Sequence, residues 1–179
     1  DPSSTAVDTP KDIHTINAKA ISAGYTHTVA IKEDGEVVAW GDNDDGECNV
    51  PADLGKVKAI SAGYNYTVAI KETGELVMWG SDILFFSDVP EGLNNVKAIS
   101  AGFLHTMALK EDGTVVAWGS NIDGECDVPI DLSNVAEISS GLGHSLALKE
   151  DGTVVAWGDN EFGQCNVPEG LNNVKSITD

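Results

Sequence analysis

A repeat of 39 residues governs this sequence. Its four tryptophans follow one another at that interval, at Trp40, Trp79, Trp118 and Trp157. The segment KEDGTVVAWG occurs unchanged at residues 110–119 and 149–158, and looser copies of it precede these two. Such a strict period indicates one supersecondary unit used four times, with each unit packed on its neighbours. We place this four-repeat region at residues 18–179, with repeats starting near residues 18, 57, 96 and 135.

Each repeat reads as a series of short strands. In the first repeat, small residues at 18–24 predict one strand and HTVAIK at 27–32 predicts a second. An Asp-Gly turn then leads into a third strand at 36–40, which is apolar on both faces and is therefore expected between two other layers, in the middle of a blade. A fourth short strand is expected to end in Val-Pro at Pro51. Four antiparallel strands per repeat predict an all-β propeller blade, whereas a parallel β-helix would not need tight hairpins.

The two ends of the repeat region raise the question of closure. Residues 1–17 read as a polar arm or linker, and residues 174–179 as the start of a fifth inner strand. Four blades in an open row would leave two apolar faces exposed. The chain could close into four blades, join a second chain head to tail into eight, or be a fragment of a longer propeller. We favour the homodimeric eight-bladed ring, sealed by the last strand or by the arm.

The charge balance excludes some partners. The formal net charge is −19 and all ten basic residues are lysines. Nucleic-acid binding depends on clustered Lys and Arg, so we expect no nucleic-acid partner. An acidic surface also repels anionic membranes and attracts basic partners, and no apolar run is long enough to cross a membrane.

The repeated histidines do not indicate catalysis. His27, His105 and His144 share one repeat position, which Tyr66 fills in the second repeat. A catalytic base or metal ligand is normally one special residue, so we expect these side chains to bond to their neighbouring turns. We predict no enzyme and no catalytic residue.

The cysteines and acidic loops also favour structural roles. Cys48, Cys126 and Cys165 share one repeat position, and without C-x-x-C spacing they predict half-buried free thiols. The loop at residues 42–47 lacks the spacing of an EF-hand and predicts a solvated turn. We expect neither a metal site nor a cofactor.

The turns between the first and second strands are candidate binding surface. Because they are expected at one end of a propeller, their aromatic residues would line its mouth and could bind a partner. The rival interpretation is that they cap the core. The candidate partner-binding residues are Tyr25, Thr26, Tyr64, Asn65, Phe103, Leu104 and Leu142.

The second repeat carries an unusual apolar loop. Ile83, Leu84, Phe85 and Phe86 replace residues that are polar or glycine in the other repeats. Four consecutive apolar residues in an exposed loop predict an interface with another chain or a neighbouring segment, with local packing over the blade as the alternative.

The unit AGxxHTxALKxDGxVxAWG resembles the repeat of the regulator-of-chromosome-condensation family. Its short form, with a Val-Pro ending, is most similar to the repeats of the second-type β-lactamase inhibitor proteins. The resemblance implies a propeller, and that superfamily includes a nucleotide exchange factor, a photoreceptor and an enzyme inhibitor whose turn aromatics contact its target. This chain departs from the family in having four repeats instead of seven. It also lacks the exchange factor's basic residues and the photoreceptor's Trp and Arg, since residues 24–28 read GYTHT.

These observations favour a non-enzymatic protein–protein interaction module, with inhibition of a bacterial enzyme as its sharpest version. A carbohydrate- or small-ligand-binding propeller and a structural or self-assembly module are the alternatives. The resemblance favours a secreted or cell-surface bacterial protein over a cytoplasmic one. No feature of the sequence names the partner.

Overall fold

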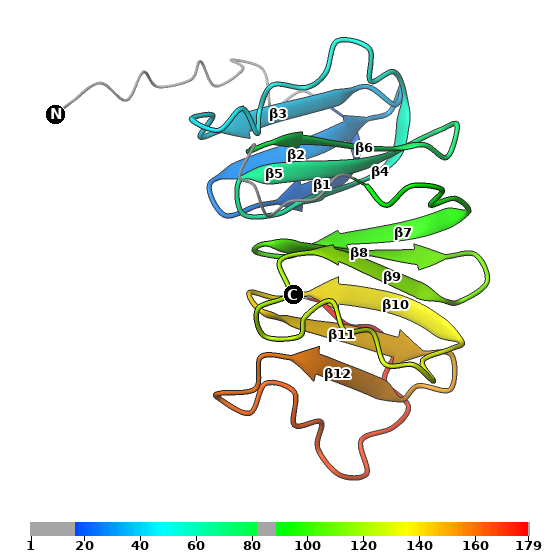
Figure 1. Ribbon diagram of the computed structural model, residues 1–179. Coiled ribbons are helices and arrows are strands. Elements are labelled where there is room, and N and C mark those ends of the chain that lie inside the picture. Colours follow the sequence, from blue (N-terminus) through cyan, green and yellow to red (C-terminus); the bar gives the residue numbers. More distant parts are fainter. Residues whose placement is uncertain (1–16, 82–88, 179) are drawn as a thin grey trace, which may run out of the picture.

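The computed structural model describes residues 17–81 and 89–178, and within them the chain is all-β. Four three-stranded antiparallel sheets, one per repeat, are stacked in a row (Figure 1). We call them blades 1 to 4. Their strands are β1 Ala18–Ala23, β2 His27–Lys32 and β3 Val37–Gly41; β4 Val57–Ala62, β5 Tyr66–Lys71 and β6 Leu76–Gly80; β7 Val96–Ala101, β8 His105–Lys110 and β9 Val115–Gly119; and β10 Val135–Ser140, β11 His144–Lys149 and β12 Val154–Gly158.

The hairpin between the second and third strands of each blade forms as its glycine predicts. Gly35 has a φ of 87°, and its N–H donates to the carbonyl of Lys32 at 2.9 Å. The Asp34 carboxylate accepts the N–H of Glu36 at 3.0 Å, which fixes the turn. Glycine reaches this left-handed conformation without steric cost, so the turn closes at this point in the chain.

The expected fourth strand does not form in the described residues, where each repeat has three strands. The segment of blade 1 that ends at Pro51 consists of turns. The N–H of Asn49 donates to the carbonyl of Gly46, and that of Leu54 to the carbonyl of Pro51. Because these turns satisfy backbone groups locally and proline has no N–H, the segment adds no rung to the sheet.

The third strand also lies elsewhere than expected. In every blade the second strand is central and the third is at the outer edge. All five residues of β3 and of β6 are half-buried. In blades 2 and 3 both faces of the edge strand are covered because a neighbouring blade packs on each side, so an apolar pattern on two faces did not require a central position.

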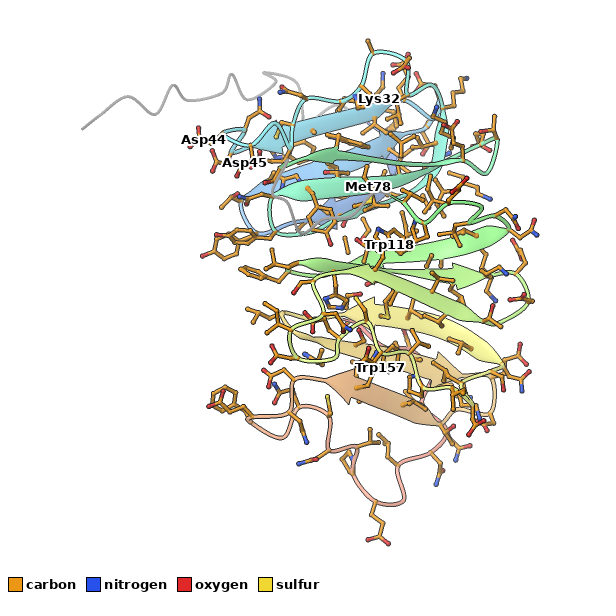
Figure 2. The ribbon with its side chains drawn as sticks, in the orientation of Figure 1. Lys32, Asp44, Asp45, Met78, Trp118 and Trp157 are labelled. Carbon is orange, nitrogen blue, oxygen red and sulfur yellow. The ribbon has the colours of Figure 1, made fainter. Side chains whose placement is uncertain are left out.

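The core lies between successive blades. Ile31 in β2 is fully buried and packs with Ala69 of blade 2 and the half-buried Trp79. Met107 and Leu109 of blade 3 pack in the same way against Ala147 and Trp157 of blade 4. The second strand of each blade therefore presents its apolar side to the following blade, and Trp118 and Trp157 lie between sheets (Figure 2).

The first strands crowd together along the inner side of the array. The Ser22 hydroxyl accepts the N–H of Ala62 at 3.0 Å, and Ser100 accepts the N–H of Ser140 at 2.9 Å. Such close approach is possible because these strands carry small residues, as the sequence predicted. Residues 174–178 lie beside β10, where Ser176 and Ile177 donate to the Glu137 carboxylate, and they form no regular strand. The predicted arm, apart from residue 17, and the loop Ile83–Phe86 lie outside the described residues.

Candidate functional site

The turns that join first and second strands form one surface, which we call the turn face: Tyr25, Tyr64, Phe103 and Leu142. The ring centroids of Tyr25 and Tyr64 are 4.7 Å apart, and those of Tyr64 and Phe103 are 4.2 Å apart. Tyr25 is 70% exposed and Leu142 is 72% exposed, while the two middle rings are half-buried. Four separate turns thus present a continuous aromatic and aliphatic row to solvent.

A shallow groove runs along this row. It has a volume of about 230 Å³ and is lined by the four side chains and by the small residues before them. These small residues are required: a Cβ on Gly63 would lie 2.3 Å from the Tyr66 ring. Pockets for drug-sized ligands usually have about 300–1,000 Å³ and enclose their ligand. The turn face is therefore better suited to a broad contact than to an enclosed small molecule.

Acidic residues border the turn face. The Asn65 side chain donates to the carboxylate of Asp45, which lies in the loop after β3. Asp123 and Asp159 both approach Gly143, the residue after Leu142. Figure 2 shows Asp44 and Asp45 at this end of the array. Every lysine in the described part of the chain instead lies toward the hairpin end of the strands, as Lys32 does.

The structure thus brings the predicted partner-binding residues together along one edge of the array, at the strand ends opposite the hairpins. Thr26 is exposed, and Asn65 and Leu104 are half-buried beside the row. Tyr25 and Leu142 do not cap a core, because most of each side chain is in solvent. That this surface binds a partner stays a prediction.

His27 and His105 join successive blades, which corrects the expectation that the histidines bond to their neighbouring turns. The Nε2 of His27 lies 2.9 Å from the Thr67 hydroxyl, and that of His105 lies 3.0 Å from the Ser145 hydroxyl. Both partners belong to the following blade. Tyr66 spans the same gap, since its hydroxyl donates to the carbonyl of His105 at 2.6 Å and accepts from the Thr106 hydroxyl at 3.1 Å.

Burial keeps the histidines between blades neutral. It lowers the pKa of His105 to about 4 and also lowers the pKa of His27. The Ser145 hydroxyl donates to the carbonyl of Glu125 at 2.8 Å, so it accepts from His105, which carries its proton on Nε2. A general base works best with a pKa near the operating pH, so these two rings are poorly suited to that task.

The cysteines close the loops that follow the third strands. All three are half-buried free thiols, as predicted. The Sγ of Cys48 donates to the carbonyl of Asp42 at 3.1 Å, and that of Cys126 to the carbonyl of Ser120 at 3.0 Å. Burial raises the pKa of Cys48 to about 11 and that of Cys126 to about 12. Reactive cysteines have a lowered pKa, so these thiols are of the structural kind.

In the acidic loop at residues 42–47, two of the carboxylates accept hydrogen bonds from backbone N–H groups of the same loop. The Asp42 carboxylate accepts the N–H of Asn43 at 2.9 Å, and that of Glu47 accepts the N–H of Asp45 at 3.0 Å. Within residues 17–81 and 89–178, no group of three or more His, Cys, Asp or Glu side chains is placed to hold a metal ion.

Two sets of structural residues escaped the sequence analysis. The hydroxyls of Thr67 and Ser145 receive the histidines, and the serines at 22, 61 and 100 link the inner strands. Both sets recur at the period of 39 residues. The period was the signal that could have identified them, because a polar residue repeated in a tightly packed strand needs a partner.

Stacked antiparallel sheets with a turn face at one end define a β-propeller-type repeat protein. The chain belongs to the regulator of chromosome condensation (RCC1) repeat family, whose repeat matches residues 18–47, 57–82, 96–125 and 135–164. No similar sequence was found among proteins of curated function.

Solved structures resemble the whole array. Prp20p from Saccharomyces cerevisiae matches with a TM-score of 0.71 and 25% identity, over 86% of this chain and 47% of its own. That structure was described with its binding properties to Gsp1p and histones. The ectodomain of the receptor kinase ACR4 from Arabidopsis thaliana matches with a TM-score of 0.70 and 20% identity, over 80% of this chain and 51% of its own. This chain therefore spans about half the length of these structures.

No helix that could span a membrane occurs in the described part of the chain.

Proposed function

We propose that this chain is a non-enzymatic protein-interaction module that binds its partner on the turn face. The observation that carries this proposal is the row of Tyr25, Tyr64, Phe103 and Leu142, in which the two middle rings pack on each other and the outer two side chains are largely exposed. Aromatic side chains supply large contact area at low entropic cost and dominate many interfaces. Prp20p, whose structure was described with its binding to other proteins, supports this class of function.

The surroundings of the row define the partner's chemistry. Carboxylates of Asp45, Asp123 and Asp159 lie at the same end, and the described lysines lie toward the other. A partner surface with apolar side chains between lysines or arginines would match this pattern in both shape and charge. Inhibition of a bacterial enzyme such as a β-lactamase is the sharpest form of the proposal, and a secreted or cell-surface location fits it.

The turn face is less suited to a carbohydrate. Sugar rings stack on aromatic side chains, but their hydroxyls also require several fixed hydrogen-bonding groups. Ser140 supplies the one polar side chain among the residues that line the groove, the hydroxyls of its two tyrosines apart. We therefore favour a protein partner.

The test replaces Tyr25, Tyr64 and Phe103 by alanine together. A matched control replaces Glu36, Glu75 and Thr114, which are exposed at the hairpin end. Both variants and the wild type are used to capture proteins from extracellular and cytoplasmic fractions, and each captured protein is then purified and titrated. Purified β-lactamase serves as a defined probe in a parallel inhibition assay.

The expected result is a partner whose Kd rises at least tenfold for the turn-face variant and stays unchanged for the control, with both variants folded. A partner that binds the turn-face variant as tightly as the wild type contradicts the proposal. Unchanged β-lactamase activity contradicts only its sharpest form.

We also propose that two chains assemble head to tail into one ring of eight blades. Within residues 17–81 and 89–178, the extensive contacts between sheets join only neighbouring blades, so no described sheet packs on the outer face of blade 1 or of blade 4 (Figure 1). Self-association buries both faces at once, as a heterologous contact that closes on itself. Light scattering tests this proposal, because the mass should be twice 18.8 kDa.

A further inference from the structure

We propose that the partner bound by the turn face also contacts the loop after β9, through an exposed isoleucine and a free carboxylate at the tip of that loop. Ile122 and Asp123, which we call the loop-tip pair, receive an apolar and a basic side chain of the partner. This inference rests on the proposed function and adds a second contact of defined chemistry.

Ile122 is exposed although it belongs to an inner blade. Its side chain is 84% exposed. Blade 3 lies between two described blades, because its strands contact sheets of blade 2 and of blade 4. The exposure of Ile122 is therefore a property of the loop itself. A large apolar side chain in solvent becomes significant when further apolar surface lies beside it.

Hydrogen bonds hold the loop in one conformation. The Asn121 side-chain oxygen accepts the N–H of Cys126 at 2.8 Å. The N–H of Asp123 donates to the buried carboxylate of Glu125, also at 2.8 Å. Ile122 lies between these fixed positions and is itself β-branched, so its side chain has few rotamers. Little conformational entropy is lost when a partner covers such a side chain.

The loop-tip pair lies beside the turn face. The carboxylate of Asp123 is 3.7 Å from the point that a Cβ on Gly143 would occupy. Gly143 directly follows Leu142, which is one of the four side chains of the turn face. Ile122 and Leu142 are thus each one residue away from the same contact, or about 3.8 Å along the chain. One partner surface can cover both.

A comparison with the contact between blades 1 and 2 explains why the Asp123 carboxylate is free. There the equivalent Asp45 accepts a hydrogen bond from the side chain of Asn65. Blade 4 has Gly143 in the place of that asparagine and offers no side chain. The Asp123 carboxylate accepts no hydrogen bond and forms no ion pair within residues 17–81 and 89–178.

The surrounding charges favour a basic group of the partner. The Cβ of Asp159 lies 3.5 Å from the same point above Gly143, which brings a second acidic side chain close to Asp123. Every lysine in the described part of the chain lies toward the hairpin end, so none of them competes for this position. A lysine or an arginine next to an apolar side chain complements such a surface in charge and in shape.

Blade 3 also carries a matched control at its other end. Ile130 and Asp131, which we call the hairpin-end pair, repeat the dipeptide of the loop tip. Ile130 is 98% exposed, and Asp131 is exposed as well. This pair lies near Lys149, a cation of the chain itself, and away from the turn face. The two pairs match in chemistry and exposure and differ in their surroundings.

Capped pentapeptides test the chemistry of the contact. The probes are acetyl-Leu-Gly-Arg-Gly-Leu-amide and its counterparts with lysine or glutamate at the centre. Each is titrated to about 10 mM into isotope-labelled protein, and the amide shifts are followed by NMR. We expect saturable shifts at Ile122, Asp123 and Gly143 with a basic peptide and none with the glutamate peptide. No saturable shift with either basic peptide, or equal shifts with all three, overturns the proposal.

Four variants test the position of the contact. Ile122→Ser should weaken binding of the basic peptide roughly tenfold, because it removes the apolar side chain from the contact. Asp123→Asn should weaken it about twofold to fivefold and reduce its salt dependence. Neither loop-tip side chain holds the loop together, so both variants should fold. The controls Ile130→Ser and Asp131→Asn should leave the affinity unchanged, and an equal loss in the controls overturns the proposal.

The protein captured by the wild type separates this proposal from the function on which it rests. Its Kd is measured for the turn-face variant and for a loop-tip variant that carries Ile122→Ser with Asp123→Asn. Lost affinity in both variants supports both proposals. A loss in the turn-face variant alone overturns the loop-tip contact and leaves the turn face. A loss in the loop-tip variant alone overturns the turn face as the binding site, and unchanged affinity in both overturns both.

Discussion

His105 and His144 hold the same position in neighbouring blades but lie in different environments. His105 is fully buried and its Nε2 bonds to Ser145, whereas His144 is half-buried and its ring makes no hydrogen bond among the described residues. The sequence around the two is nearly the same. The difference arises because blade 4 follows blade 3 and no described blade follows blade 4. A repeated residue therefore acquires its role from the next repeat.

The largest difference in unfolding free energy should come from replacing His105 and His144 by alanine in two separate variants. His105→Ala removes a fully buried side chain and leaves a cavity between blades 3 and 4, which should cost about 3 kcal/mol of unfolding free energy. His144→Ala should cost less than about 1 kcal/mol at low protein concentration, where association contributes least. Urea unfolding measures both. Equal losses would mean that the next blade does not create the difference.

Acid should destabilise the folded protein through the buried histidines, His105 above all. The pKa of His105 is about 4 when folded and 6.5 when exposed, so its contribution is complete above pH 6.5 and is lost as the pH falls toward 4. At 1.36 kcal/mol per unit, the loss approaches about 3 kcal/mol. His27, whose pKa is also lowered by burial, acts in the same direction.

The control for this pH dependence is His105→Tyr, because Tyr66 fills the position in blade 2. Thermal unfolding between pH 7 and pH 4 should show a smaller loss for this variant than for the wild type. The same loss in both proteins would exclude His105 as its source.

A smaller effect is expected from the tryptophans. Trp79→Phe removes the bond from Nε1 to the carbonyl of Glu47 and should cost about 1 kcal/mol. Trp40→Phe removes no such bond among the described residues and should change the unfolding free energy by less than about 0.5 kcal/mol at low protein concentration. If Trp40→Phe proves the more damaging, blade 1 has an intramolecular partner.

The smallest effect concerns two loops in different blades. The pKa of Cys126 is about 12 and that of Cys48 about 11, so Cys126 has less thiolate at any neutral pH. Alkylation at pH 8, followed by mass spectrometry, should modify Cys126 several-fold more slowly. In urea, where the protein is unfolded, the alkylation rates of Cys126 and Cys48 should converge. A difference that persists in urea would come from the residues adjacent to each cysteine in the sequence and not from burial.

Much of the fold could be predicted because its signals are local. Gly35 and its equivalents required a turn at fixed places, and the small residues of the first strands anticipated their close packing. The position of the third strand was predicted wrongly, since burial on two faces does not distinguish a central strand from an edge strand between stacked blades. The fourth strand was expected from Val-Pro, yet local turns satisfy that backbone.

The candidate site was predictable in part for the same reason. The turns after Gly24, Gly63, Gly102 and Gly141 were recognised because their residues differ among repeats whose strands agree. The hydrogen bonds between blades were missed because each joins residues about one repeat apart. Their partners, such as Thr67 for His27, become neighbours only when the blades stack.

The sequence by itself determined the unit: its period, its strands and hairpin, and the side chains that every blade offers its neighbours. Hydrophobic patterning and glycine conformation act over a few residues, so they can be read along the chain. Tertiary structure alone decided which of those equal side chains are paired. His27 and His105 reach hydroxyls of the following blade, while His144 has no described blade after it and Thr28 none before it, because burial and hydrogen bonding depend on what packs against a blade.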